Sequence, residues 1–175
     1  MYKRQVQLAI AGDGETRSVL EEMTRGLGIA DSVHFLGYRR DLATIAAASD
    51  AVILSSDNEG TPVSLIEASA AARPSVATTV GGVREVVTDQ TGILVPPDDF
   101  AALAAGIERM AGDPDLRAAM GQRAREHAMS RYSAERLVGD IDSLYRELLD
   151  ARNGFERHSA APDGEISPSK AGEPA

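Results

Sequence analysis

Short apolar runs alternate with helical segments along most of this chain, and that alternation limits the fold more than any other feature. The runs predicted to be β-strands are 6–11, 33–36, 51–54, 75–78 and 92–95. Helices are predicted at 16–27, 41–48, 62–72, 83–87, 98–111, 113–127 and 133–149. Strands that alternate with helices form a parallel sheet covered on both faces. We therefore predict an α/β domain with a Rossmann-like, doubly wound parallel sheet and helices at its C-terminal end.

Composition separates one ordered domain from a short tail. With 175 residues, 43% of them hydrophobic, the chain can build one domain with a real core. The periodic pattern ends near Arg152, and the segment after it holds Gly, Pro, Ser and Glu with little to bury. We predict one domain over residues 1–150 and a disordered tail over residues 151–175.

The charge balance and the lack of cysteine exclude several classes of function. A net charge of −9 argues against strong attraction to nucleic acid or anionic lipid, so local dipoles would have to hold any phosphate ligand. The absence of cysteine excludes disulfides and thiolate metal sites, and no other group of residues has metal-ligand spacing. The N-terminus lacks the apolar stretch of a signal peptide, and no run approaches the roughly 20 apolar residues that span a bilayer. We expect a cytoplasmic, soluble protein without a metal site.

The segment that begins at Glu59 predicts an anion site at the start of a helix. Thr61 is a good N-cap residue, and Pro62 is a good first helical residue. The next backbone N–H groups point out of the helix end, where the macrodipole is positive, and they belong to Val63, Ser64 and Leu65. Gly60 allows a ligand to approach the backbone closely. The segment follows a predicted parallel strand, at the edge where open α/β sheets bind ligands. The alternative is an ordinary capped helix.

Two carboxylates bracket this helix start. Glu67 lies about five residues into the helix, roughly 7–8 Å from its N-terminus at 1.5 Å per residue. That separation suits a carboxylate that accepts hydrogen bonds from a ribose while phosphate sits at the helix end. Glu59 lies on the opposite side of the phosphate position, where it would have to meet hydroxyl groups or a cation. For both residues, the alternative is a solvated surface position.

Other candidate sites are weaker. Gly12-Asp13-Gly14 follows a strand, but Arg17 stands where the dinucleotide motif G-x-G-x-x-G needs its third glycine, so a tight turn is predicted, with contact to a nucleotide as the alternative. None of the histidines has a catalytic partner that the sequence reveals; they are His34, His127 and His158. The sequence contains neither a G-x-S-x-G nucleophile elbow nor a Walker A motif.

Seven segments in a characteristic order resemble a known family. They are 8–14, 33–37, 49–56, 59–68, 73–78, 81–87 and 91–95. In this order they resemble the C-terminal, donor-binding domain of family 4 (group 1) glycosyltransferases of the GT-B fold. The likeness covers residues 6–149. Each segment is weak evidence alone, and the ordered set is strong evidence.

The resemblance implies a reaction and a role for each site residue. The family transfers a sugar from a nucleotide-diphosphate-sugar donor with retention at the anomeric carbon, usually without a metal or other cofactor. Its paired glutamates match Glu59 and Glu67, so Glu67 is expected to hold the ribose and Glu59 to position the donor sugar. The backbone of residues 60–63 is expected to hold the diphosphate. The base would be lined by Leu36, Gly37 and Tyr38. The leaving phosphate is thought to act as the base for the acceptor.

Three departures from the family pattern affect these expectations. Thr61-Pro62 replaces a common aromatic–glycine pair, and Arg73 stands where many members have glycine. The first strand and helix of the domain are also absent, together with an Arg and a Lys that neutralise the diphosphate, and so is the N-terminal acceptor domain. We therefore expect a fragment that binds donor weakly and transfers nothing alone. The predicted strands 6–11 and 51–54 flank the missing strand, so they either pair with each other or leave two edges exposed.

Two other functions remain open from the sequence. One is a non-catalytic nucleotide-sugar-binding or regulatory module built from this half of the fold. The other is a GT-B nucleotide-sugar epimerase, although its catalytic acids and histidine cannot be placed in this chain. The expected partners are the nucleotide-sugar donor, an unidentified acceptor and the absent N-terminal domain, through which peripheral membrane attachment is conceivable.

Overall fold

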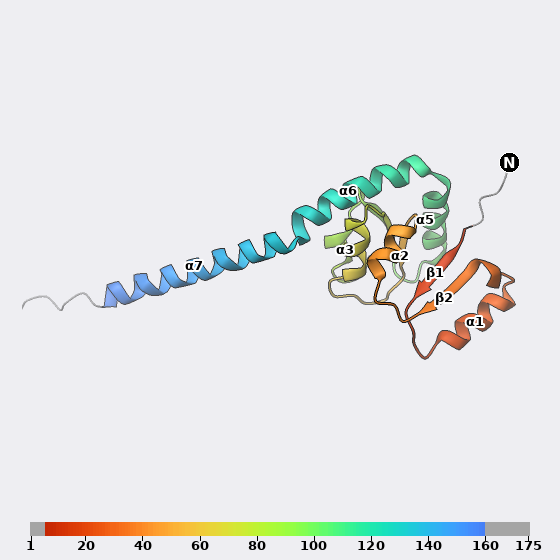
Figure 1. Ribbon diagram of the computed structural model, residues 1–175, viewed down its shortest axis with the longest axis horizontal. Coiled ribbons are helices and arrows are strands. Elements are labelled where there is room, and N and C mark those ends of the chain that lie inside the picture. Colours follow the sequence, from red (N-terminus) through yellow and green to blue (C-terminus); the bar gives the residue numbers. More distant parts are fainter. Residues whose placement is uncertain (1–5, 160–175) are drawn as a thin grey trace, which may run out of the picture. The chain divides into compact units, whose positions relative to one another are not determined.

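A computed structural model describes the backbone of residues 6–159 and the side chains of residues 6–152 (Figure 1). The strands are β1 (Leu8–Ala11), β2 (Val33–Gly37), β3 (Val52–Leu54), β4 (Ser75–Thr78) and β5 (Gly92–Val95). The helices are α1 (Arg17–Gly26), α2 (Leu42–Ala48), α3 (Val63–Ala70), α4 (Val83–Val86), α5 (Phe100–Gly112), α6 (Pro114–Tyr132) and α7 (Ala134–Ser159), with a 3-10 turn at η1 (Ala30–Ser32). The predicted α/β class with parallel strands is confirmed.

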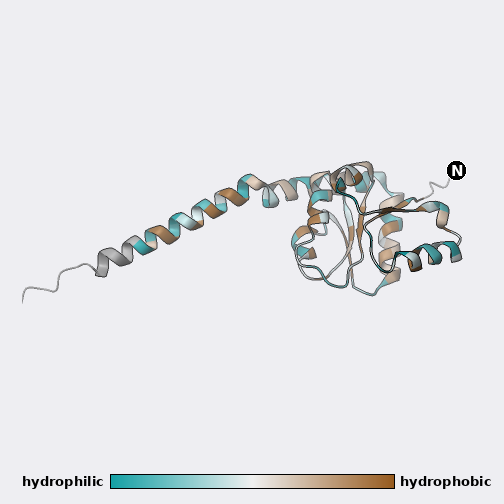
Figure 2. Ribbon diagram, turned by 60° about the horizontal axis from the view of Figure 1, so that its bottom comes forward, coloured by the Kyte–Doolittle hydropathy of each residue, from teal (hydrophilic) through white to brown (hydrophobic). Residues whose placement is uncertain are grey.

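Strands β3, β4 and β5 form a parallel sheet that helices cover on both faces. Successive residues of a strand point to opposite faces. Ala77 of β4 accordingly packs in a cluster with Leu65 of α3 and Val83 of α4. Its neighbour Val76 packs in a second cluster with Met110 of α5 and Met120 of α6. Apolar strands, brown in Figure 2, thus lie between two helical layers, which explains why β4 is buried at all four positions.

Strands β1 and β2 form a separate two-stranded parallel sheet. Leu8 pairs with Val33, and Ile10 pairs with Phe35. The register then shifts, so that Ala11 pairs with Gly37, and this bulge lies at the carboxyl end of β2. Within the described residues β1 does not pair with β3. Of the two outcomes that the sequence left open, the structure therefore shows the one in which β1 and β3 each keep an unpaired edge.

The part of the domain that contains β1, α1 and β2 lacks the core that the rest possesses. Between residues 6 and 45 the structure buries no residue. The buried hydrophobic residues that it describes begin at Ala46 and continue to Ala128. The prediction that every strand is covered on both faces is therefore wrong for β1. The physical reason is that no element among the described residues occupies the place beside it.

The C-terminal helices partly match their predicted boundaries. The predicted start at Asp113 is confirmed, because its side chain accepts a hydrogen bond from the Leu116 backbone N–H at 2.9 Å and Pro114 opens α6. Helix α7 continues to Ser159, so the predicted helix end at Leu149 is wrong, and the predicted start of the tail falls within this helix. The composition of the segment led to too short a predicted length for α7, because local backbone hydrogen bonds extend a helix that is already nucleated. The remainder of the predicted tail, 160–175, lies outside the described residues.

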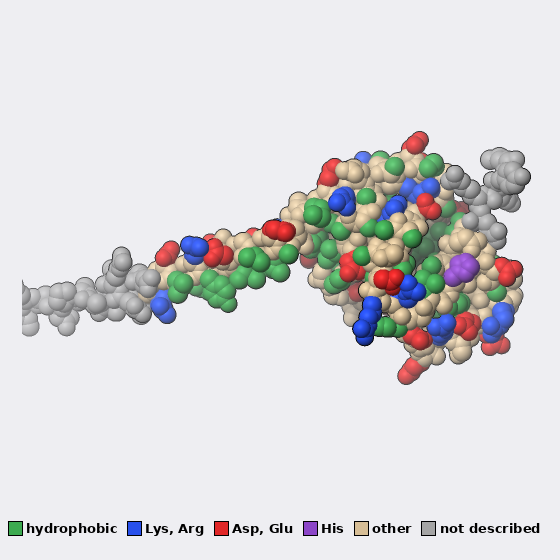
Figure 3. Space-filling model, in the orientation of Figure 1, with side chains coloured by type: hydrophobic (Ala, Val, Ile, Leu, Met, Phe, Trp, Pro, Cys, Tyr) green, Lys and Arg blue, Asp and Glu red, His purple; other side chains and the backbone are tan. Residues whose placement is uncertain are grey.

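Helix α7 belongs to a second compact unit of the chain. Its hydrophobic side chains gather along one side, and its charged side chains gather along the other (Figure 3). The exposed hydrophobic residues include Leu137, Ile141, Leu144 and Leu148, at alternating spacings of four and three residues. No helix in the described part of the chain is long and apolar enough to cross a membrane.

Candidate functional site

The loop between β3 and α3 holds one of the two predicted acids in a defined position. Glu59 is half-buried, and its carboxylate accepts a hydrogen bond from the Ser56 hydroxyl at 2.7 Å. The Ser56 backbone carbonyl in turn accepts a hydrogen bond at 2.6 Å from the hydroxyl of Thr78, which is the last residue of β4. Because Thr78 is 5% exposed, this chain of contacts anchors the Glu59 loop to the buried sheet.

Two glycines after β4, Gly81 and Gly82, pack closely against the backbone of the same loop. The backbone N–H of Gly82 donates to the Gly60 carbonyl at 3.1 Å and lies 3.4 Å from that of Glu59. A Cβ atom at Gly81 would lie 1.7 Å from the Glu59 carbonyl oxygen, and one at Gly82 would lie 2.4 Å from the Gly60 carbonyl oxygen. The sequence showed a glycine pair after a strand, which signals a turn. It did not show that the turn packs against the loop of Glu59.

The helix N-terminus differs in detail from the prediction. The N-cap residue of α3 is Pro62 and not Thr61, which is exposed and makes no capping hydrogen bond. The Pro62 carbonyl accepts hydrogen bonds from the N–H groups of Leu65 and Ile66 at 3.0 and 3.3 Å, so Leu65 is not a free donor as predicted. The structure describes no acceptor for four other backbone N–H groups, which belong to Gly60, Thr61, Val63 and Ser64. Four donors at a helix N-terminus make a site suited to an anion.

The second acid, Glu67, is the fifth residue of α3 and is half-buried. It therefore lies about 6 Å along the helix axis from Val63, at 1.5 Å per residue. The buried residues of α3 are Leu65, Ala68 and Ser69, and Ile66 is half-buried against the same core, whereas Val63 is 61% exposed. Which residues of this short helix are buried depends on its contacts with α2 and α6, and not only on the periodicity of its own sequence.

Neither acid is neutralised within the described part of the chain. The ion pairs that the structure describes there include neither Glu59 nor Glu67. The four free N–H groups thus lie between two carboxylates that have no cationic partner of their own. Such an arrangement can receive a phosphate at the helix end and hydroxyl groups on either side of it.

The three residues predicted to line a base lie on the other sheet. Gly37 ends β2 with a positive φ of 65°, and its carbonyl accepts a hydrogen bond from the Gly12 N–H at 2.8 Å. Leu36 and Tyr38, on either side, are 36% and 75% exposed. Among the described residues, no hydrogen bond or ion pair joins this segment to the loop of Glu59. Both acids thus lie in the segment that follows β3, one in the loop and one in α3, whereas the predicted base site lies at the end of β2, on a separate sheet.

An ion pair between Arg39 and Asp41 follows the end of β2. Arg39 donates two hydrogen bonds to Asp41, at 2.8 and 2.6 Å, and this hydrogen bonding lowers the pKa of the Asp41 carboxyl. Asp41 occupies the N-cap position of α2, but its side chain accepts hydrogen bonds from Arg39 and caps no backbone N–H group of the helix. Both side chains are 43% exposed, so this ion pair adds no buried charge.

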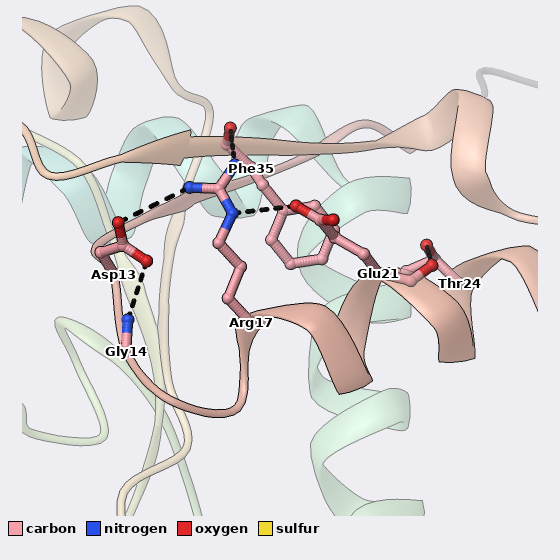
Figure 4. A network of polar contacts seen from close by, with 6 residues as sticks. All are labelled: Asp13, Gly14, Arg17, Glu21, Thr24 and Phe35. Carbon is pink, nitrogen blue, oxygen red and sulfur yellow. Dashed lines mark hydrogen bonds and ion pairs between the residues drawn. The ribbon is translucent and has the colours of Figure 1, made fainter.

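Arg17 connects the glycine turn to β2 (Figure 4). Its guanidinium donates to Glu21 at 2.8 Å and to the Phe35 carbonyl at 3.4 Å, and it lies 3.9 Å from Asp13. The hydrogen bond with Glu21 raises the pKa of Arg17 further above its usual value, so the group stays charged. These contacts agree with the predicted structural turn at Gly12–Gly14. From the sequence, Arg17 was noted only as a departure from a glycine motif. Its contacts with Asp13, Glu21 and the Phe35 carbonyl were not predicted.

The chain matches one protein-family model and is similar to several known proteins. The model described as "Glycosyl transferases group 1" matches residues 2–127. The exopolysaccharide phosphotransferase SCO2592 of Streptomyces coelicolor is 36% identical over 160 residues, 90% of this chain and 17% of that protein. The D-inositol 3-phosphate glycosyltransferase of Corynebacterium urealyticum is 36% identical over 156 residues, 86% of this chain and 37% of that protein.

A solved structure shares both the fold and part of the sequence. Anabaena Alr3699/HepE, in complex with UDP-glucose, matches with a TM-score of 0.73 and 29% identity over 85% of this chain and 42% of that one. The chain thus spans less than half the length of each of these three relatives. With the family model covering most of the described domain, this chain belongs to the glycosyl transferases group 1 family and corresponds to the C-terminal, donor-binding domain of its GT-B members.

Proposed function

We propose that this chain is the donor half of a retaining, metal-independent glycosyltransferase that uses a nucleotide-diphosphate-sugar. The observation that carries this proposal is the set of four free backbone N–H groups at the start of α3, flanked by Glu59 and Glu67. A dipole with free donors binds phosphate without a basic surface, which suits a chain with a net charge of −9. The complex of the HepE relative with UDP-glucose makes a uridine nucleotide the first donor to test.

Each residue then has a defined task. Glu67 accepts hydrogen bonds from the ribose hydroxyls, and the N–H groups of residues 60–64 hold the diphosphate. Glu59, oriented by Ser56, accepts hydrogen bonds from hydroxyls of the donor sugar and acts as a positioning residue. The base contacts the segment from Leu36 to Tyr38, which requires that segment to come close to α3 in the complete enzyme.

The chemical step follows from these tasks. The bond between the anomeric carbon and the diphosphate oxygen breaks, and the helix dipole and N–H groups stabilise the charge that develops on the leaving group. The acceptor hydroxyl attacks from the same face, and its proton passes to an oxygen of the leaving phosphate. This chain supplies the donor side of the reaction only, so transfer requires an acceptor-binding partner.

Calorimetric and NMR titrations with UDP, GDP and ADP test the proposal. We expect the chain to prefer one nucleotide, and Glu67→Ala to weaken its binding about 10- to 100-fold, because hydrogen bonds to a charged group contribute about 1.5–3 kcal/mol. Glu108→Ala is the matched control, since Glu108 is an exposed glutamate in the middle of α5. Unchanged binding by Glu67→Ala, or an equal loss in both variants, would contradict the ribose assignment.

A further inference from the structure

Helix α4 is a single turn of four residues, so its position depends on contacts with the rest of the fold. A helix this short is not stable alone, because one turn does not offset the entropy cost of nucleation. The structure holds α4 in two ways. The side chains of Val83 and Val86 are buried in one cluster with Leu65 of α3. The backbone of α4 is held at Glu85 by two side chains of α6.

These two α6 side chains bind the same carbonyl oxygen. The Tyr132 hydroxyl donates to the Glu85 carbonyl at 2.8 Å, and His127 Nε2 lies 3.2 Å from the same oxygen. Because a carbonyl oxygen can only accept, His127 carries a proton on Nε2 and donates as well. The two rings are in edge-to-face contact, with centroids 6.3 Å apart, and both residues are half-buried. A carbonyl in the last turn of a helix lacks an intrahelical donor, so these contacts supply the donors that α4 cannot.

Backbone hydrogen bonds continue from Glu85 to the loop of Glu59. The Glu85 N–H donates to the Gly82 carbonyl at 3.1 Å, and the Gly82 N–H donates to the Gly60 carbonyl at 3.1 Å. The contact leaves no free space, because a Cβ atom at Gly82 would lie 2.4 Å from the Gly60 carbonyl oxygen. Since packed backbone transmits displacement, a movement of α4 also moves Gly60 and its neighbour Glu59.

We propose that Tyr132 and His127 are positioning residues that set the orientation of Glu59 toward the donor sugar. They act at a distance, through α4 and the turn at Gly81 and Gly82. This inference rests on the proposed function, which assigns Glu59 to the donor sugar. Loss of the α6 donors allows α4 and the loop to shift, so that the carboxylate meets the sugar hydroxyls in a less favourable geometry. A displacement of about 1 Å is enough to weaken such an interaction strongly.

Hydrogen exchange of the ligand-free chain tests the link between α6 and the loop. Tyr132→Phe removes the hydroxyl and keeps the ring, so the chain should fold. We expect the Gly82 amide to exchange at least about threefold faster than in the parent, relative to the amide of Ala77 in the buried strand β4. The backbone NMR shifts of Glu59 should change as well. Tyr145→Phe, at a 64% exposed tyrosine of α7, is the matched control and should change neither quantity.

Titration with UDP-glucose tests the effect on the donor. We expect Tyr132→Phe to raise the Kd about threefold or more, and Tyr132→Phe combined with His127→Leu to raise it about tenfold or more. His127→Gln keeps an N–H donor at a similar reach and should bind like the parent. In a chain that already carries Glu59→Gln, Tyr132→Phe should have little further effect on the Kd, because the contact through which it acts is already lost.

Several results would overturn the proposal. Unchanged exchange of the Gly82 amide in Tyr132→Phe would show that the α6 contacts do not hold the loop. An equal loss of UDP-glucose binding with and without Glu59→Gln would show that Tyr132 acts through general stability and not through Glu59. An equal loss in Tyr145→Phe would lead to the same conclusion. If the parent chain binds no nucleotide, the donor-binding proposal fails, whereas exchange in the free chain still decides whether α6 holds the loop.

Discussion

Gly81→Ala should displace the loop that carries Glu59. A Cβ atom at position 81 would lie 1.7 Å from the Glu59 carbonyl oxygen, far inside van der Waals contact, so the backbone on one side has to move. Gly81 also has a positive φ of 45°, which an alanine adopts only with strain. Two independent costs therefore act at one exposed turn residue.

The size of the effect follows from these two costs. The left-handed conformation costs an alanine about 1–2 kcal/mol. Forcing a methyl group into packed space costs about 1–3 kcal/mol. The expected loss in the free energy of unfolding is therefore about 2–5 kcal/mol, which lowers the melting temperature by roughly 4–20 °C in a chain of this length. Gly82→Ala carries only the steric cost, since its φ is −78°, so it should lose about 1–3 kcal/mol.

Urea unfolding of three variants separates these causes. Gly60→Ala is the matched control, because a Cβ there meets no atom within 4 Å and the substitution should change stability by less than about 0.5 kcal/mol. The expected order of destabilisation is Gly81→Ala, then Gly82→Ala, then Gly60→Ala. A free energy of unfolding of Gly81→Ala within about 0.5 kcal/mol of the parent would refute the reasoning. So would an equal loss in Gly60→Ala.

Three further predictions concern the anchor, the helix cap and the donor sugar. Thr78→Val should destabilise the chain by about 1–2 kcal/mol in urea unfolding, because the partly buried hydrogen bond from the Thr78 hydroxyl to the Ser56 carbonyl is lost; full stability would show that this hydrogen bond contributes nothing. Asp113→Ala should cost about 1 kcal/mol in the same assay through loss of the α6 cap, whereas Asp115→Ala, two residues further on in the first turn, should cost less because it removes only the interaction with the helix dipole; equal effects would contradict the capping role. Glu59→Gln should weaken binding of UDP-glucose and leave binding of UDP unchanged in NMR titrations; an equal effect on both ligands would remove Glu59 from the donor sugar.

The strands and the site segment were predictable for a shared reason. Each strand is a short run of apolar residues bounded by glycine, proline or aspartate, and such local signals survive in any tertiary context. Five strands were therefore located to within a few residues. The helix after Glu59 was likewise expected, because Pro62 and the apolar residues that follow are strong local signals.

Contacts between distant segments were not predictable in this way. Thr78 and Ser56 are 22 positions apart, and Gly82 meets Gly60 across a similar separation. The residues next to one partner in the sequence do not indicate which distant residue it will contact. The cap of α3 was also misplaced by one residue, because Thr61 has the right chemistry for a cap while the path of the loop makes Pro62 the N-cap residue.

By itself the sequence determined the α/β class, the order of the elements and the two acids that bracket a helix start, because periodicity and residue chemistry are local properties. Tertiary structure alone decided that Glu59 is held through Ser56 and Thr78, that Gly81 and Gly82 support its loop, and that Leu36 to Tyr38 lie on a separate sheet. It also decided that β1 and β3 remain apart. Strand pairing joins residues far apart in the chain, so whether a gap closes depends on how the surrounding layers pack and not on the apolar run itself.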